Sequence, residues 1–252
     1  MIDNHTNDYL LDKKIKIFQP SNGYRASSDA VLLSAMPENS LKNVKILDVG
    51  SGTGAVSLCL AYRLQKNNVQ ISGFELQKEL VNLSNKSAEA NGFDFVHFYL
   101  ADIRNKIEIP EYKPCSFDVV ISNPPYSECD MPSPNESKAI AHNHRNFSLD
   151  NWLAFCLKSL KPFGKLYLIN RAEALAGICS FLQNKAGNIT ILPIYSKQEQ
   201  VAKRVIVAAQ KDSKAPCRIL PPLIMHDSAG NYTAEGEKIL RKGLSFGELI
   251  NI

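Results

Sequence analysis

The chain has 252 residues, of which 44% are hydrophobic and 21% charged, and its formal net charge is +4 at pH 7. This size and composition suit one large packed α/β domain with at most a small appendage. The weak positive charge neither requires nor excludes a polyanionic partner, because a mild excess of Lys and Arg is common on solvated surfaces.

The beginning of the chain, MIDNHTNDYLLDKK, is polar and acidic, which argues against a signal peptide. No apolar run approaches the ~18 residues that a membrane helix needs. The six cysteines include no C-x-x-C pair and have no histidine cluster nearby, so we expect no metal site. Scattered cysteines on apolar faces, such as Cys59 and Cys156, are typical of a reducing compartment. We therefore predict a cytoplasmic protein, and we expect it to be a monomer.

Segments of strand and helix character alternate through the predicted core domain, residues 44–211. The predicted strands are 44–49, 69–74, 95–100, 117–121, 165–169, 189–195 and 204–209, and the predicted helices are 55–66, 78–91, 152–160 and 172–185. Such alternation indicates a mostly parallel sheet with helices on both faces. We predict an α/β, Rossmann-like fold with a seven-stranded sheet.

Residues 1–43 precede this core and are predicted to form a hairpin and one helix. Ile15 and Ile17 alternate with polar residues as in a strand, and Asn22-Gly23 after them is a hairpin-turn signal. Ser27 or Ser28 then caps a short helix that contains Asp29.

Two other segments depart from the alternating pattern. Residues 127–146 are polar and contain Pro132 and Pro134, which predicts a long mobile loop. Residues 212–252 contain three further prolines and a turn-like stretch, so we predict a C-terminal extension with a hairpin or short helix rather than a second domain.

A glycine-rich turn joins the first core strand to the first core helix. Its sequence is Asp48-Val49-Gly50-Ser51-Gly52-Thr53-Gly54, and glycines there let the backbone come close to a ligand. Glu75 ends the next strand, where a carboxylate can accept hydrogen bonds from both hydroxyls of a ribose. A tight β–α turn without a ligand is the alternative for the glycines alone.

The acidic residues at the strand ends distinguish between nucleotide ligands. Asp48 directly before the turn would repel a diphosphate, whereas it suits a cationic group such as a methionine ammonium. Asp102 ends the third strand and could accept a hydrogen bond from an adenine amino group, or it could simply cap a turn. Three carboxylates at three successive strand ends favour a cofactor site for S-adenosyl-L-methionine.

The segment after the fourth strand, Asn123-Pro124-Pro125-Tyr126, carries the predicted chemistry. Two prolines cannot continue a strand, so this segment is stiff at the carboxyl edge of the sheet, where ligands bind. The Asn123 side-chain carbonyl and the Pro124 backbone carbonyl match the two hydrogens of a planar amino group, and Tyr126 can stack on the ring. A strand-ending turn without catalytic meaning is the alternative.

With these residues in view, the chain resembles class I methyltransferases, and within them the bacterial tRNA1(Val) adenine-N6 methyltransferases. The segment from Gln19 to Leu33 resembles that family's Q-P-x-x-G-Y-R-x-x-x-D-x-x-L-L pattern. Residues 73–77 and 202–205 resemble other segments of the same family. The resemblance implies methylation of adenosine 37, beside the anticodon of valine tRNA, and therefore a role in tRNA modification. It also implies that the N-terminal helix covers the cofactor. The cofactor set is then completed by Tyr24, Arg25, Asp29, Leu76, Ile103 and Asn123.

Other enzymes remain open at this stage. Glutamine-amide N5-methyltransferases of release factors share the Asn-Pro-Pro-Tyr motif, but they usually carry a larger helical N-terminal domain. An rRNA guanine-N2 methyltransferase usually has Phe in place of Tyr126. A DNA adenine methyltransferase would need a separate target-recognition domain. A non-catalytic RNA-binding module is disfavoured because Asn123 and the glycine turn are intact.

Contacts with RNA are the least specific part of the pattern. Ser127 departs from the aromatic residue that often follows the motif in the resembling family. The loop that follows offers Lys138, His142, His144 and Arg145 as phosphate contacts, and a basic stretch near the last strand comprises Lys197, Lys203, Arg204, Lys211, Lys214 and Arg218. A solvated face is the alternative for that stretch.

Overall fold

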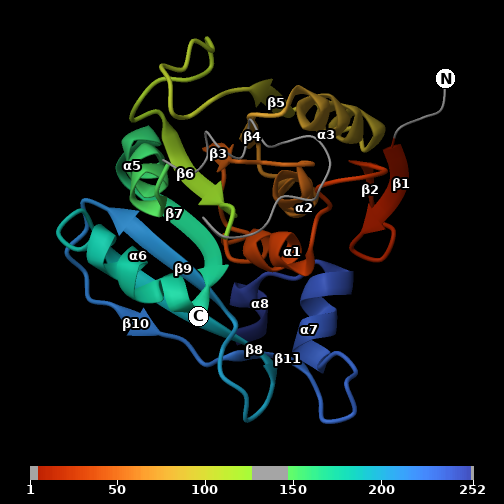
Figure 1. Ribbon diagram of the computed structural model, residues 1–252, viewed down its shortest axis with the longest axis vertical. Helices are drawn as coiled ribbons and strands as arrows, with labels where there is room; N and C mark the ends of the chain where they lie inside the picture. Colours follow the sequence, from red (N-terminus) through yellow and green to blue (C-terminus); the bar gives the residue numbers. More distant parts are fainter. Residues whose placement is uncertain (1–4, 127–146, 251–252) are drawn as a thin grey trace.

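The computed structural model describes residues 5–126 and 147–250 (Figure 1). The predicted loop 127–146 and its candidate phosphate contacts lie outside the described residues. The strands are β1 (His5–Leu10), β2 (Ile15–Pro20), β3 (Lys45–Val49), β4 (Gln70–Glu75), β5 (Val96–Leu100), β6 (Phe117–Ser122), β7 (Leu160–Arg171), β8 (Ala186–Lys197), β9 (Arg204–Lys211), β10 (Arg218–Ile219) and β11 (Leu223–His226). The helices are α1 (Ser28–Ser34), α2 (Ala55–Leu64), α3 (Lys78–Ala90), α5 (Leu149–Ser159), α6 (Leu175–Leu182), α7 (Ala234–Glu237) and α8 (Phe246–Ile250), with short helical turns η1 (Ala172–Ala174) and η2 (Lys238–Lys242).

The central sheet has the predicted α/β architecture. Its strand order is β10-β8-β9-β7-β6-β3-β4-β5, with β11 also paired to β8. Strands β3, β4, β5, β6 and β7 pair in parallel, and β9 is antiparallel to both β7 and β8. The carboxyl ends of β3, β4, β5 and β6 therefore lie along one edge, as the connecting helices α2 and α3 require.

The described sheet has nine strands rather than the predicted seven. The two additional strands, β10 and β11, come from the segment predicted as a C-terminal extension and pair in parallel with β8. They are two and four residues long. Strands this short beside prolines have too few residues to show an alternating pattern, so the prediction missed them.

Hydrophobic residues pack on both faces of the sheet, and neighbouring residues in each strand point to opposite faces. Ile46 in β3 belongs to the core under α1, α2 and α3, whereas Leu47 belongs to the core under α5 and α6. Ile121 and Val120 in β6 divide in the same way. This continuous burial on both faces is typical of parallel strands.

The N-terminal hairpin is present, but its predicted turn is wrong. β1 and β2 pair from His5↔Pro20 to Leu10↔Ile15, so the turn lies at residues 11–14, and Asn22-Gly23 follows the hairpin. Leu11, Asp12 and Lys13 adopt positive φ angles of 49°, 53° and 66°. Leu11 is buried in the core. This burial holds the turn in a conformation that its residue types do not favour on their own.

The short helix α1 begins where the sequence predicts. Ser27 is the N-cap, and its side chain accepts a hydrogen bond from the Asp29 backbone N–H. Leu32 and Leu33 are buried, and α1 packs against α2. The residues between β2 and α1 thereby reach the carboxyl edge of the sheet.

Among the helices of residues 5–126 and 147–250, none has both the length and the apolar character to cross a bilayer.

Candidate active site

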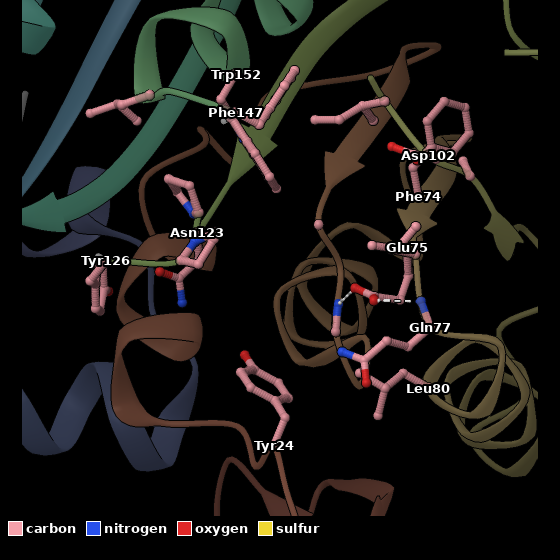
Figure 2. A pocket seen from close by; sticks show the side chains of 18 of the residues that line it. Tyr24, Phe74, Glu75, Gln77, Leu80, Asp102, Asn123, Tyr126, Phe147 and Trp152 are labelled. Carbon is pink, nitrogen blue, oxygen red and sulfur yellow. Dashed lines mark hydrogen bonds between the residues drawn. The ribbon is translucent and has the colours of Figure 1, made fainter. Parts of the chain in front are cut away.

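A cavity of about 740 Å³ opens at the carboxyl edge of β3, β4, β5 and β6. Figure 2 shows Asn123 and Tyr126 on one side of it and Glu75 and Asp102 on the other, with Tyr24 between them. Its volume lies in the range of about 300–1,000 Å³ that is usual for pockets that bind small molecules and cofactors. The motifs after four separate strands thus meet at one cavity.

The glycine turn after β3 forms part of the cavity wall. Gly50 and Gly52 line the cavity with φ angles of 72° and 56°, in the left-handed region. A Cβ atom on Gly50 would lie 2.7 Å from the Trp152 ring, and one on Gly52 would lie 2.7 Å from the Tyr24 ring. The turn ends at Gly54, the residue directly before α2. Only glycine fits these positions while the two aromatic rings keep their places.

Unsatisfied polar atoms are concentrated at the glycine turn and the Asn-Pro-Pro-Tyr segment. Within the described residues, the buried side-chain atoms without a hydrogen-bond partner are Asp48 Oδ1, Ser51 Oγ, Thr53 Oγ1 and Asn123 Oδ1. Leaving such an atom unpaired in a protein interior costs about 1–3 kcal/mol. Of these residues, Asn123 lines the cavity, whereas Asp48, Ser51 and Thr53 lie in the turn behind Gly50 and Gly52, which do line it.

Asp48 lies beneath the glycine turn and is 1% exposed. Burial raises its pKa to about 7, and the nearby charge of Glu75 acts in the same direction, although a hydrogen bond from Ser57 opposes the rise. Asp48 is not among the described residues that line the cavity. Its predicted role toward a methionine ammonium remains a prediction.

Glu75 at the end of β4 is held by two backbone N–H groups. Oε2 accepts from Gly52 N–H at 3.0 Å and Oε1 accepts from Gln77 N–H at 2.9 Å, as Figure 2 shows. Each carboxylate oxygen can accept a further hydrogen bond. Leu76 lines the same part of the cavity. These two bonds fix the carboxylate in an orientation in which it can accept hydrogen bonds from two neighbouring hydroxyl groups.

Asp102 after β5 is engaged locally. Its carboxylate forms an ion pair with Arg104, whose Nη2 lies 2.6 Å from Oδ2, and it also accepts hydrogen bonds from the Arg104 backbone N–H and the Asn105 side-chain amide. Asp102 and Ile103 both line the cavity. The structure therefore contains the turn-capping arrangement that was the alternative for Asp102. The predicted hydrogen bond to an adenine amino group remains a prediction.

Hydrogen bonds of the preceding residue, Ser122, anchor the Asn-Pro-Pro-Tyr segment. Ser122, the residue before Asn123, donates to the Val49 carbonyl of β3 at 2.7 Å and accepts from Trp152 Nε1 at 2.9 Å. Asn123 and Pro124 both line the cavity. The segment is thus fixed to β3 and α5, which lets Asn123 present an acceptor in a defined position.

Tyr126 forms a network with residues from two distant parts of the chain. Its hydroxyl donates to Asp29 Oδ2 at 2.6 Å, and Arg204 Nε donates to the same oxygen at 2.9 Å. The Arg204 guanidinium also lies over the Tyr126 ring, 4.6 Å from its centroid. Burial and the Asp29 charge raise the pKa of Tyr126, so its hydroxyl stays protonated and donates.

The predicted N-terminal site residues divide between the cavity and this network. Tyr24 and Arg25 line the cavity, whereas Asp29 is absent from its described lining and faces Tyr126. The Arg25 guanidinium is bound to Asp8 at 2.8 Å and to Thr6 at 3.0 Å, which ties the cavity rim to the hairpin.

Sequence reasoning missed the aromatic wall of the cavity. Phe74, Phe147 and Trp152 line it, and the rings of Phe147 and Trp152 meet edge to face with centroids 6.2 Å apart. Trp152 is the only tryptophan of the chain. Its place in a predicted helix was its only sequence signal, and that signal does not say which way the ring points.

The remaining predicted groups lie outside the cavity. Within residues 5–126 and 147–250, no group of three or more His, Cys, Asp and Glu side chains is placed to hold a metal ion. In the predicted basic stretch, Arg204 pairs with Asp29, Lys211 donates to the Leu160 carbonyl and Arg218 donates to Thr190.

Known proteins are similar to this chain in fold and in sequence. The family model described as "Methyltransferase domain" matches residues 40–218. A crystal structure of a predicted O-methyltransferase from Agrobacterium tumefaciens superposes with a TM-score of 0.70 at 24% identity, covering 86% of this chain and 97% of the other. At that identity the likeness shows the fold alone. Fold, cavity and family model define a class I methyltransferase, an enzyme that uses S-adenosyl-L-methionine.

Comparison with relatives of known name identifies the family within this class. The Haemophilus influenzae (strain PittGG) protein named tRNA1(Val) (adenine(37)-N6)-methyltransferase is 32% identical over 168 residues, which cover 64% of this chain and 68% of that protein. A protein of the same name from Porphyromonas gingivalis is 25% identical over 239 residues, covering 90% and 91% of the two chains. This chain belongs to their family.

The residues of the cavity fit this cofactor. Gly50 and Gly52 of the turn line the cavity, Glu75 presents two fixed acceptor oxygens, and buried polar atoms of the turn lack partners among the described residues. The neighbouring aromatic wall can pack against a flat base.

Proposed function

We propose that this enzyme methylates N6 of an adenine in tRNA, namely adenosine 37 beside the anticodon of valine tRNA. The observation that carries the proposal is the buried, unpaired Asn123 Oδ1 at the cavity, next to Pro124 and Tyr126. The names of the curated relatives support the same reaction and the same base.

The chemistry explains why two acceptors are needed. An adenine amino group is a weak nucleophile because its lone pair is delocalised into the ring. Hydrogen bonds from its two hydrogens to Asn123 Oδ1 and to the Pro124 carbonyl raise the electron density on nitrogen and favour a tetrahedral geometry. S-adenosyl-L-methionine, when bound, supplies an electrophilic methyl group. Orienting the nitrogen toward that group would contribute on the order of 7–11 kcal/mol, and the nitrogen would release one proton after the transfer.

The cofactor would be held by the strand-end groups. Glu75 would accept hydrogen bonds from the ribose hydroxyls, Gly50 and Gly52 would border the cofactor, and Asp48 would interact with its cationic methionine end. Leu76, Ile103 and Tyr24 would line the rest of the cofactor site.

The target base has to leave its stack to reach Asn123. Tyr126 is suited to receive it because Asp29 and Arg204 hold its ring in one orientation. A stacking platform with a fixed orientation loses little conformational entropy when the base binds.

Methyl transfer to purified substrates tests the proposal. Radiolabelled cofactor is supplied with total tRNA, total rRNA and release factor in parallel, and then with valine tRNA in which adenosine 37 is replaced by guanosine. We expect label in tRNA and its loss with the replacement. Label confined to release factor would refute the tRNA assignment and favour the glutamine-amide reaction, because an amide presents the same pair of hydrogens.

Replacing Asn123 with Ala tests the catalytic role. We expect methyl transfer to fall by at least about 100-fold, as when a preorganised hydrogen-bonding group is removed from an active site. Cofactor affinity, measured by calorimetry, should change little. Asn170→Ala is the matched control, because Asn170 lines the same cavity but its Oδ1 already accepts from Arg171 N–H. Equal loss of cofactor binding and activity in Asn123→Ala would assign Asn123 a structural role instead.

The cytoplasmic location and the monomeric state belong to the same proposal. Five cysteines of the described residues are free thiols, two of them buried, which suits a reducing compartment.

A further inference from the structure

Three cationic or basic side chains gather around one phenyl ring on the N-terminal hairpin. Lys16 Nζ lies 4.8 Å and Lys86 Nζ 4.3 Å from the centroid of Phe18, and the His5 ring meets Phe18 edge to face at 5.4 Å. His5, Lys16 and Phe18 come from β1 and β2, whereas Lys86 comes from α3. We call these four residues the hairpin cluster.

Hydrogen bonds between the β2 backbone and α3 hold this part of the hairpin in place. Asn91 at the end of α3 accepts from Lys16 N–H at 2.9 Å and donates to the Lys16 carbonyl at 2.7 Å. Ser87 Oγ accepts from Phe18 N–H at 2.9 Å. In Figure 1 the hairpin accordingly lies beside α3. The Phe18 ring, over which both ammonium groups lie, is therefore fixed between β2 and α3.

The two lysines of the cluster, Lys16 and Lys86, have no acidic partner within ion-pair distance among the described residues. Lys86 Nζ instead lies 2.9 Å from His5 Nε2. Like charges at close range destabilise each other, and binding of an anion removes that cost. An exposed tyrosine, Tyr9, stands opposite Lys16 in the β1–β2 ladder.

The cluster lies on elements that also reach the cavity. Leu80 of α3 lines the cavity, and Lys86 follows it by six residues, about 9 Å along the helix axis. The chain from β2 runs directly to Tyr24 and Arg25 at the cavity rim. A polymer whose base occupies the cavity can therefore continue over the hairpin.

We infer that the hairpin cluster is a docking surface for the phosphate backbone of the RNA substrate, outside the catalytic cavity. This inference rests on the proposed tRNA substrate. Two ammonium groups held over one buried phenyl ring suit a chain of phosphates. A purely structural role for the lysines, clamping β2 to α3, is the outcome that the experiment must separate.

The test is the salt dependence of tRNA binding without methyl transfer. Each lost phosphate contact lowers the slope of log K against log salt by about 1. For Lys16→Gln/Lys86→Gln, the decrease in affinity between 50 and 200 mM salt should therefore be about tenfold smaller than in the parent enzyme. The rate at saturating tRNA should stay unchanged, because the cluster is outside the cavity.

Two variants serve as controls. Lys185 lies over the Phe181 ring at 4.1 Å and donates to the Phe181 carbonyl, so Lys185→Gln removes a similar lysine–phenyl contact outside the cluster and should leave the slope unchanged. Lys16→Arg/Lys86→Arg keeps both charges and should restore the parent slope.

The outcomes separate the two proposals. A parent enzyme that does not methylate tRNA refutes the proposed function, whatever the lysine variants do. A parent that methylates tRNA while the Gln double variant keeps the parent slope overturns the docking surface. So does a lower melting temperature with an unchanged slope, because that result assigns the lysines to the fold. Unchanged tRNA binding with impaired methylation of release factor would assign the surface to a protein partner and also overturn the inference.

Discussion

Asp48→Asn should stabilise the cofactor-free enzyme at alkaline pH. Burial raises the pKa of Asp48 to about 7, whereas the pKa of an unperturbed Asp carboxyl is 3.8. The folded state therefore holds this proton more tightly than the unfolded state, and unfolding releases it between pH 3.8 and about 7. Stability falls as pH rises through that window and then levels off, because the folded protein must carry a buried charge.

The size of the effect follows from the same two pKa values. One pKa unit corresponds to about 1.4 kcal/mol, so the ionised Asp48 costs the folded state ~4 kcal/mol above pH 7. Asn has no such penalty, but its amide must occupy the place of the unpaired Oδ1, at a cost of about 1–3 kcal/mol. The variant should then exceed the parent by roughly 1–3 kcal/mol at pH 8.

Denaturant unfolding at several pH values measures this difference. The stability of the variant relative to the parent should rise by ~3 kcal/mol between pH 5 and pH 8, while the contributions of other titrating groups cancel. Adding S-adenosyl-L-methionine should stabilise the parent more than the variant, because only the parent offers a carboxylate to the ammonium of the ligand. A stability difference that is the same at pH 5 and pH 8 would refute the reasoning.

Two further substitutions address the cavity and its rim. Gly52→Ala should weaken cofactor binding by about tenfold or more, ~1.4 kcal/mol, because the new Cβ meets the Tyr24 ring at 2.7 Å; equilibrium dialysis measures this. Arg204→Met should lower kcat/KM for tRNA by about 10–100-fold, because Tyr126 loses the nearer of the two guanidinium groups over its ring and Asp29 loses its ion pair. Cofactor affinity, measured by calorimetry, should stay near the parent value.

Each of these variants has an internal control. Gly92 also has a positive φ, 69°, but nothing lies within 4 Å of its Cβ position, so Gly92→Ala should cost stability without weakening the cofactor. If both glycine variants weakened the cofactor equally, the close approach to Tyr24 would not be the cause. For the rim, Arg204→Lys should recover only part of the activity. Full recovery by Lys would mean that charge alone matters, not the hydrogen bond from Nε to Asp29.

Local patterns in the sequence were sufficient to predict most of the core elements. Parallel strands such as 117–122 are buried on both faces and therefore appear as continuous apolar runs, which pattern reasoning recognises. Ser27 could be predicted as a helix cap because capping depends on neighbouring residues alone. The hairpin turn was misplaced because Leu11 is held by core contacts, which outweigh the local preference for Asn-Gly.

The sequence by itself determined the chemistry of this protein. The glycine turn, Glu75 and Asn123 are recognisable because each follows a strand, and parallel strands bring their carboxyl ends to one edge whatever the rest of the chain does. Only the tertiary structure decided which distant side chains meet there. Asp29 lies 97 residues before Tyr126 and 175 residues before Arg204, and it is hydrogen-bonded to both. No local sequence pattern encodes contacts between residues so far apart in the chain. The same holds for the Trp152 ring against Gly50 and for the lysines of the hairpin cluster, because their positions depend on how α5, β2 and α3 pack.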